Sequence, residues 1–141
     1  MRKINLNKFF EIIDLERINN QNSNILKIIN ENHKNFLDIK EVYCSTIKKN
    51  DIRAWKKHTK MFCNILVIKG SIKFVFFDNS FSTSKEIIIS EDNSKILFIK
   101  PNIWFGFKGL YENNSLINFS NIMHDESEVL RKKYNEEYTE F

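Results

Sequence analysis

The sequence has few of the residues that interrupt helices and strands, form cross-links or bind metals. Its 141 residues include three glycines, one proline, two cysteines and three histidines. Cys44 and Cys63 form no Cys-x-x-Cys pair, and the histidines form no His-x-His or His-x-x-x-His pair. Metals are usually held by such closely spaced ligands. We therefore expect a reduced chain without a disulfide framework, and a site that uses no metal and no other cofactor.

Long apolar runs and sorting signals are also missing. The uninterrupted apolar runs are about four residues long, whereas a membrane-spanning helix needs about 20 residues. The N-terminus lacks the charged, apolar and small-residue regions of a signal peptide. The sequence has no phosphate-binding glycine loop and no Gly-x-Ser-x-Gly motif. We expect a cytoplasmic protein that has no membrane partner.

Excess positive charge is present only locally. The chain has 22 Lys and Arg residues against 18 Asp and Glu residues, a net charge of +4. Much of the excess comes from one segment whose single acidic residue is Asp51; its basic residues are Lys48, Lys49, Arg53, Lys56, Lys57 and Lys60. Nucleic acid is bound by an extended basic surface. A local cluster therefore favours a small anionic ligand over nucleic acid.

Patterns typical of β-strands are abundant. Short apolar segments are separated by Asn, Asp, Ser or Gly, which favour turns; the predicted strands are 25–29, 41–47, 63–69, 72–77, 86–90, 95–100 and 116–123. Gly70 and residues 91–94 mark the two clearest hairpins. With 42% hydrophobic residues, the chain can build a core. We expect a single all-β domain, a double-sheet sandwich or barrel.

The two ends of the chain are expected to differ from this body. Residues 1–23 carry apolar residues without a clean period and are predicted to form an N-terminal arm, with the body over residues 24–124. Residues 125–141 are predicted to form a helical tail. Asp125 can cap a helix over 126–138, in which four residues have helical spacing: Val129, Leu130, Lys133 and Tyr134.

The basic segment also contains a histidine. If the segment is extended, Lys56, His58 and Lys60 share one face, because strand side chains alternate. Neighbouring positive charges lower the pKa of histidine and lysine, which suits a neutral base near pH 7. Arg53 could hold a carboxylate or phosphate by two parallel hydrogen bonds. The alternative is a solvated basic edge strand that discourages aggregation.

Two further groups are candidates for a binding site. Glu41, Tyr43 and Ser45 alternate along a predicted strand, so they either line a pocket or face solvent while Val42 and Cys44 face the core. Trp104 opens a dense aromatic run and could stack on a sugar or a base, although such residues are often core. His124 is expected at the surface or at the entry of the tail helix.

The order of these features resembles the dTDP-4-dehydrorhamnose 3,5-epimerase family and its sister dTDP-sugar 3,4-ketoisomerases. The resemblance covers roughly residues 24–127 and is carried by these segments: Glu41-Val-Tyr, the basic segment centred on Arg53, Ile65 to Asp78 with Gly70, Glu91-Asp-Asn-Ser, Ile99-Lys-Pro, and Trp104-Phe-Gly-Phe. It implies a cupin-type jelly roll that acts as a homodimer, uses no metal and binds a nucleotide-linked 4-keto sugar. Arg53 matches the family arginine, Lys56 takes the place of a first histidine, and His58 matches a second.

The chain departs from the family pattern at several positions. Ala54 replaces a glycine, Asn64 a lysine, Phe105 a histidine, and Ile122 or Met123 a tyrosine. With these losses, the sequence offers no obvious charged group to orient His58, unless Glu41 supplies one.

The resulting functional prediction is a metal-independent epimerase or ketoisomerase of a nucleotide-linked 4-keto sugar, in surface polysaccharide precursor synthesis. His58 is the predicted general base, and Lys56 stabilises enolate charge. The predicted substrate-binding residues are Arg53, Lys60, Glu41, Tyr43, Asn64 and Trp104. The alternative is a catalytically inactive cupin that binds a sugar nucleotide.

Overall fold

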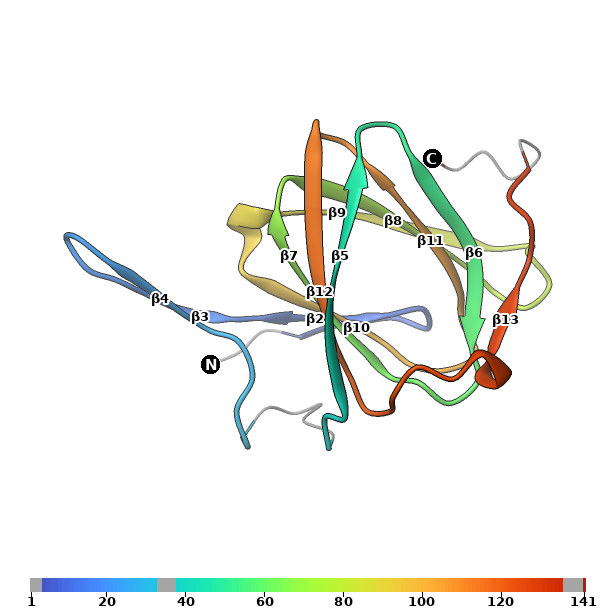
Figure 1. Cartoon of the computed structure of the whole chain (residues 1–141), viewed down its shortest axis with the longest axis horizontal. Coiled ribbons are helices and arrows are strands. Elements are labelled where there is room, and N and C mark those ends of the chain that lie inside the picture. Colours follow the sequence, from blue (N-terminus) through green and yellow to red (C-terminus); the bar gives the residue numbers. More distant parts are fainter. Residues whose placement is uncertain (1–3, 33–37, 136–140) are drawn as a thin grey trace.

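Two antiparallel β-sheets make up nearly the whole molecule (Figure 1). The computed structural model describes residues 4–32, 38–135 and 141. Its strands are β1 (Ile4–Leu6), β2 (Glu11–Asp14), β3 (Glu16–Asn19), β4 (Asn24–Lys27), β5 (Glu41–Lys48), β6 (Ile52–His58), β7 (Cys63–Lys69), β8 (Ser71–Phe77), β9 (Ser84–Ser90), β10 (Lys95–Ile99), β11 (Trp104–Gly109), β12 (Asn113–Ser120) and β13 (Val129–Arg131). Two single-turn 3₁₀ helices, η1 (Glu91–Asn93) and η2 (Glu126–Glu128), complete the described elements.

The two sheets face each other as a jelly roll, which confirms the predicted all-β class. The larger sheet has the strand order β1-β2-β10-β7-β12-β5, and the smaller has β13-β6-β11-β8-β9. Consecutive strands such as β7 and β8 belong to different sheets, so the chain crosses repeatedly from one sheet to the other. The main core fills the space between them and includes Phe74, Phe76 and Leu97, each 0% exposed. Burying one such side chain contributes roughly 1.5–3 kcal/mol.

The chain turns at Gly70 between β7 and β8, but these strands belong to different sheets, so the predicted hairpin there is wrong and the turn is a corner between the sheets. Residues 91–94 likewise join β9 and β10, which belong to different sheets, rather than forming the second predicted hairpin. Gly70 has φ +73°, a left-handed conformation that side chains disfavour. A Cβ there would also lie 2.3 Å from Asn114 Oδ1. That amide oxygen accepts a hydrogen bond from the Ser71 backbone N–H at 2.9 Å. Gly70 therefore lets a buried asparagine bind the turn from the neighbouring strand.

The N-terminal region divides between the body and a projecting hairpin. β2 pairs with β10 inside the larger sheet, so the jelly roll begins before the boundary at residue 24 that the sequence predicts. β3 and β4 pair only with each other in the described structure and project from the body (Figure 1). Ile12 and Ile13 are buried, which explains why a segment without a clean period still joins the sheet.

The predicted C-terminal helix over 126–138 is wrong for residues 126–135, and the rest of it lies outside the described residues. Asp125 does cap η2, accepting a hydrogen bond from the Ser127 N–H at 2.9 Å, but the chain then extends as β13 along β6. Val129 is 9% exposed and Leu130 is 46% exposed, an alternation typical of a strand. The tail pairs with the open edge of β6, and Trp55 and Lys132 exchange two backbone hydrogen bonds. Pairing with the edge of β6 therefore decides the structure of this segment, although its apolar residues have helical spacing.

No helix in the described part of the chain is long and apolar enough to cross a membrane.

Candidate functional site

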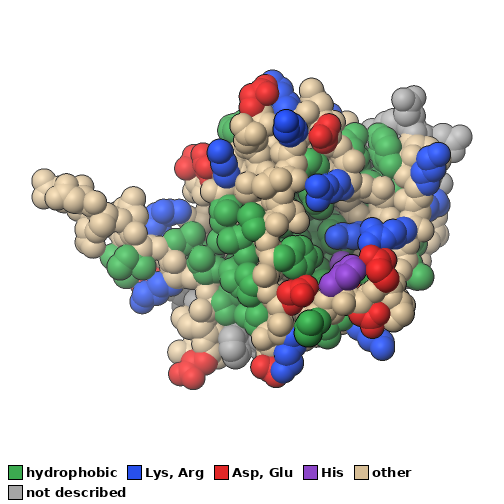
Figure 2. Space-filling model, viewed as in Figure 1, with side chains coloured by type: hydrophobic (Ala, Val, Ile, Leu, Met, Phe, Trp, Pro, Cys, Tyr) green, Lys and Arg blue, Asp and Glu red, His purple; other side chains and the backbone are tan. Residues whose placement is uncertain are grey.

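A cavity of about 590 Å³ opens between the two sheets. The larger sheet contributes β5, β7 and β12, and the smaller contributes β6, β11 and the β13 region. The residues that border it are Tyr43, Ser45, Arg53, Ala54, Trp55, Lys56, Cys63, Ile65, Phe105, Phe107, Leu116, Asn118, Arg131, Lys132 and Lys133. In the space-filling view, Lys and Arg side chains gather around this hollow (Figure 2). The cavity thus has an apolar floor and a basic rim.

An irregularity in the smaller sheet turns two cations toward the cavity. Phe105 pairs with Lys56 and Phe107 pairs with Arg53, so two steps along β11 match three along β6. The extra residue in β6 is a bulge, which re-aims the side chains around it. Arg53 and Lys56, three positions apart, consequently border the same cavity. A regular strand would direct them to opposite faces.

Gly106 makes this irregular pairing sterically feasible. A Cβ at Gly106 would lie 2.5 Å from the Ala54 Cβ and 2.9 Å from the Arg53 carbonyl oxygen. The two backbones therefore approach more closely than any larger residue would allow. One of the few glycines in the chain is placed where β11 meets the bulge of β6.

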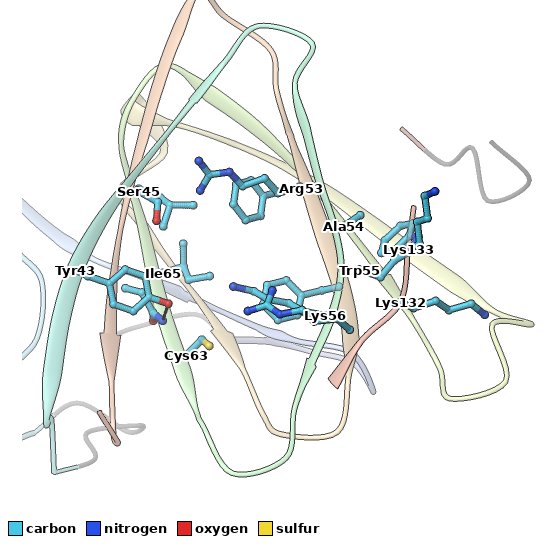
Figure 3. Close-up of a pocket in the computed structure, with 15 residues that line it drawn as sticks. Tyr43, Ser45, Arg53, Ala54, Trp55, Lys56, Cys63, Ile65, Lys132 and Lys133 are labelled. Atoms are coloured by element: carbon cyan, nitrogen blue, oxygen red, sulfur yellow. Dashed lines mark hydrogen bonds between the residues drawn. The ribbon is translucent and has the colours of Figure 1, made fainter. Parts of the chain in front are cut away.

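The cavity rim is strongly cationic. Five bordering residues are basic, and none of the described bordering residues is acidic. Arg53 and Lys56 extend from β6 into the space between the sheets, while Lys132 and Lys133 point away from it (Figure 3). Arg131 pairs directly with Lys56 across β13 and β6, which puts both side chains on the same face. Burial lowers the pKa of Lys56, and the charges of Arg131 and Arg53 lower it further.

The opposite wall carries polar groups that stay neutral. Asn118 Nδ2 donates a hydrogen bond to Tyr43 Oη at 2.9 Å, so the tyrosine O–H remains available as a donor. Burial raises the pKa of Tyr43, and this outweighs the opposing effect of the Asn118 hydrogen bond. Burial also raises the pKa of Cys63 to about 11. The tyrosine is thus a proton donor at neutral pH, and the cysteine is an unreactive thiol.

His58 is held by a buried glutamate from the C-terminal segment. His58 Nδ1 lies 2.7 Å from Glu128 Oε2, and the two side chains are 5% and 1% exposed. The other oxygen, Glu128 Oε1, accepts hydrogen bonds from the backbone N–H groups of Met61 at 2.8 Å and Lys60 at 3.2 Å. Burial acts to raise the pKa of Glu128, but these hydrogen bonds and that from His58 outweigh it and lower the pKa. Glu128 is therefore an ionised acceptor.

This arrangement fixes the tautomer of His58. An ionised carboxylate can only accept, so Nδ1 carries the proton and Nε2 carries the lone pair. Burial lowers the pKa of His58, and the Lys56 charge adds to this effect, although the Glu128 hydrogen bond opposes it. Nε2 is buried and has no hydrogen-bond partner among the described residues. His58 is thus a neutral imidazole with a free basic nitrogen, 6.1 Å between ring centroids from Phe105, which borders the cavity.

Comparison with known proteins identifies the family. The profile of the FdtA family, described as WxcM-like, C-terminal, matches residues 8–141. The chain belongs to this family. Among curated proteins, none matches the sequence.

Several solved structures share the fold of this FdtA-family chain. A dTDP sugar isomerase from Desulfovibrio desulfuricans G20 is 22% identical with a TM-score of 0.83, covering 95% of this chain and 90% of that chain. A dTDP-4-dehydrorhamnose 3,5-epimerase from Sulfolobus tokodaii is 18% identical with a TM-score of 0.85, covering 99% and 85%. QdtA, a sugar 3,4-ketoisomerase from Thermoanaerobacterium thermosaccharolyticum in complex with TDP, is 23% identical with a TM-score of 0.79, covering 90% of each chain. The expected likeness to this group of folds is confirmed.

Of the residues predicted for the site, the structure brings three to the cavity, namely Arg53, Lys56 and Tyr43. Ser45 joins them, while Val42 is 53% exposed and Cys44 is exposed. The pocket-facing interpretation of the alternation in β5 is therefore correct for Tyr43 and Ser45. His58 lies on the same face of β6 as Lys56, one alternation further on, without bordering the cavity.

The other four predicted binding residues do not border the cavity. Asn64 is buried on the opposite face of β7, and Trp104 packs against Phe81 with ring centroids 5.6 Å apart. Lys60 follows the end of β6 and is exposed. Their roles stay predictions.

Glu41 is not the orienting group of His58. Its Oε1 accepts a hydrogen bond from the His124 backbone N–H at 3.3 Å, and Glu128 takes the predicted place. Sequence reasoning missed Glu128 because it assigned that segment to a helix. Glu128 would have been found if residues 129–131 had been predicted as a strand that pairs with the edge of β6.

Proposed function

We propose that this chain is a metal-independent isomerase of a nucleotide-linked 4-keto sugar, an epimerase or a ketoisomerase. The observation that carries the proposal is the buried His58–Glu128 pair, in which Nε2 has no hydrogen-bond partner among the described residues, on the strand whose Arg53 and Lys56 border a cavity with a cationic rim. The anionic diphosphate of the substrate suits Arg53, whose guanidinium can bind phosphate oxygens by two parallel hydrogen bonds. Similar folds that carry dTDP-sugar isomerase, epimerase and ketoisomerase names support this choice.

The chemistry common to these reactions is proton transfer at the carbon next to a ketone. In the proposed reaction, His58 Nε2 removes that proton, and Glu128 stabilises the imidazolium that results. Negative charge develops on the ketone oxygen, and positive charges at Lys56 and Arg131 stabilise it, an effect that is often the largest in enzyme catalysis. Tyr43 is the neutral hydroxyl that can return a proton on the opposite side.

Isotope exchange tests this proposal. The protein is incubated in D₂O with TDP-4-keto-6-deoxyglucose, and deuterium at the carbons next to the ketone is followed by NMR. We expect His58→Ala to slow incorporation by about 10²- to 10⁴-fold, the usual contribution of a general base. The matched control is His124→Ala, which removes a histidine whose side chain is 55% exposed. Unchanged exchange in His58→Ala would contradict the assignment.

A second candidate is binding of the sugar nucleotide without turnover. The observation in its favour is that His58 does not border the cavity, and that Phe105 occupies a position where the family resemblance implies a histidine. Ligand binding to the folded state raises the melting temperature by mass action. Stabilisation by TDP and by TDP-4-keto-6-deoxyglucose, with no deuterium incorporation above the protein-free rate, would favour this function.

The cellular setting and the assembly stay predictions. We predict a homodimer that is located in the cytoplasm and takes part in the synthesis of surface polysaccharide precursors. Val42 and Ile68, which are 53% and 43% exposed on the outer face of the larger sheet, are apolar residues that a second copy could cover. Sedimentation measures the oligomeric state directly.

A further inference from the structure

Lys56 is an amine directed into the cavity. Its Nζ lies 5.6 Å from the centroid of the Phe105 ring. Arg131 is its partner across β13, and Tyr43 and Cys63 lie on the opposite wall of the same cavity. Within the described residues, no carboxylate forms an ion pair with Lys56. An ammonium group without an ion-pair partner in these surroundings is less favoured than one in water.

Two features act against a positive charge on the Lys56 amine. Lys56 is partly buried at the cavity, and the guanidinium groups of Arg53 and Arg131 repel a third positive charge. Burial is the largest cause that lowers the pKa of Lys56, and the charges of Arg131 and Arg53 lower it further, while Cys63 and Glu128 act in the opposite direction. A lysine desolvated in this way, next to other cations, is a nucleophile toward carbonyl groups.

We propose that Lys56 attacks the ketone of the bound sugar nucleotide and forms an imine with it. This inference rests on the proposed function, because the proposed substrate supplies the ketone. It goes beyond a purely electrostatic role for the Lys56 charge.

The step balances without any further reactant. The lone pair of Nζ forms a bond to the ketone carbon, the C–O π electrons move to oxygen, and a proton passes from nitrogen to that oxygen to give a carbinolamine. The C–O bond then breaks with a proton, releasing water and leaving an iminium ion. The iminium nitrogen draws electrons from the neighbouring C–H bond, so His58 Nε2 can take that proton and leave an enamine. Reprotonation at the same carbon and addition of water regenerate the ketone and the free amine.

The imine route discriminates between the two isomerase reactions. Epimerisation needs a proton to leave and return at the carbon beside the nitrogen-bearing carbon, and hydrolysis then frees Lys56. Carbonyl transposition needs the proton to be added to the nitrogen-bearing carbon itself. That carbon would then be joined to Lys56 by a secondary amine, which water does not cleave. Lys56 catalysis by this route therefore predicts an epimerase.

Reductive trapping tests the covalent step. The protein is incubated with TDP-4-keto-6-deoxyglucose and sodium cyanoborohydride, digested, and analysed by mass spectrometry. We expect the reduced adduct on Lys56 to exceed that on Lys132 or Lys133 at least about tenfold, because binding raises the local ketone concentration at Lys56. Lys132 and Lys133 point away from the cavity (Figure 3) and serve as internal controls. Equal labelling of the three lysines would overturn the proposal.

Loss of ketone ¹⁸O gives a second measurement. Each cycle of imine formation and hydrolysis replaces the ketone oxygen with one from water, whereas proton transfer through an enolate leaves it in place. We expect the wild-type protein to accelerate ¹⁸O loss over the protein-free hydration rate. The Lys56→Arg variant, which keeps the positive charge, should return to that rate while its melting temperature stays close to that of the wild type. A wild-type rate equal to the protein-free rate would contradict the proposal.

The two proposals fail in different ways. Deuterium incorporation that survives in Lys56→Arg, with neither trapping nor ¹⁸O loss in the wild type, overturns the imine and supports the proposed isomerase. The opposite result is trapping at Lys56 together with ¹⁸O loss, but no deuterium incorporation. It would support the imine and contradict the proposed proton transfer at the neighbouring carbon.

Discussion

Two histidine–glutamate pairs use neighbouring residues of the same C-terminal segment, yet they have opposite surroundings. His58 Nδ1 lies 2.7 Å from Glu128 Oε2, with side chains 5% and 1% exposed. His124 Nε2 lies 3.0 Å from Glu126 Oε1, with side chains 55% and 64% exposed. The residue types are the same in both pairs. The first pair is buried in one arrangement, and the second is a solvated surface contact.

The buried pair has the fixed geometry that the proposed base requires. Glu128 is held by two backbone N–H groups as well as by His58, so the imidazole ring has one orientation and one tautomer. Glu126 is shared between His124 and Arg131 Nη2, which is also 3.0 Å away. Water can replace either partner at the surface, and such pairs contribute little to stability.

Removing the buried carboxylate should have the largest effect. We expect Glu128→Ala to reduce the free energy of unfolding by about 3–5 kcal/mol, since breaking one partner of a buried pair leaves the other groups without a partner. His58 Nδ1–H and the backbone N–H groups of Met61 and Lys60 would all lose their acceptor. Urea denaturation measures the change. Glu128→Gln is the matched variant, because its amide oxygen can still accept from the backbone; a loss as large as that of Glu128→Ala would argue against this explanation.

Most of the sheet architecture could be predicted, because turn residues and alternation are local signals. Gly70 marks a turn with φ +73°, and β7 and β8 agree with their predicted ranges within one residue. The turn joins the two sheets and not two paired strands, because a local turn signal does not say which strands pair. β11 was missed because its aromatic residues do not alternate with polar ones. Both of its faces are covered, by the main core at Phe105 and Phe107 and by a second aromatic cluster that contains Trp104.

The site could be predicted only in part, because its geometry depends on long-range pairing. Arg53, Lys56 and Tyr43 were found from residue type and alternation. The bulge that turns Arg53 and Lys56 to one face arises from the register of β6 against β11, which no local pattern encodes. Glu128 is 70 residues from His58 in the sequence, and helical spacing of apolar residues hid the strand that brings it there.

Acidification should affect the buried pair at two stages. The pKa of His58 is lower in the folded protein than its ordinary value of 6.5, so the unfolded chain binds the proton first. Stability should therefore fall as the pH drops from about 7 toward the folded pKa, by about 1.4 kcal/mol for each unit of pKa depression. The pKa of Glu128 is also lowered, from 4.5, which adds a further loss as the pH falls below that value.

Urea denaturation at several pH values between 7.5 and 5 measures the first stage. His58→Asn removes the titrating group, so its free energy of unfolding should fall less steeply over this range. His124→Asn should run parallel to the wild type. A slope that is unchanged in His58→Asn would show that other groups cause the acid sensitivity.

The smallest effect should come from the exposed pair. We expect His124→Ala to change the melting temperature by no more than about 2 °C, because solvent screens an exposed ion pair and ordering its side chains costs entropy. Any difference should shrink further in 0.5 M NaCl, where the Debye length is only about 4 Å. The same salt should leave the effect of Glu128→Ala largely unchanged, since ions do not reach a carboxylate that is 1% exposed. Equal salt sensitivity of the two variants would mean that burial is not what separates the pairs.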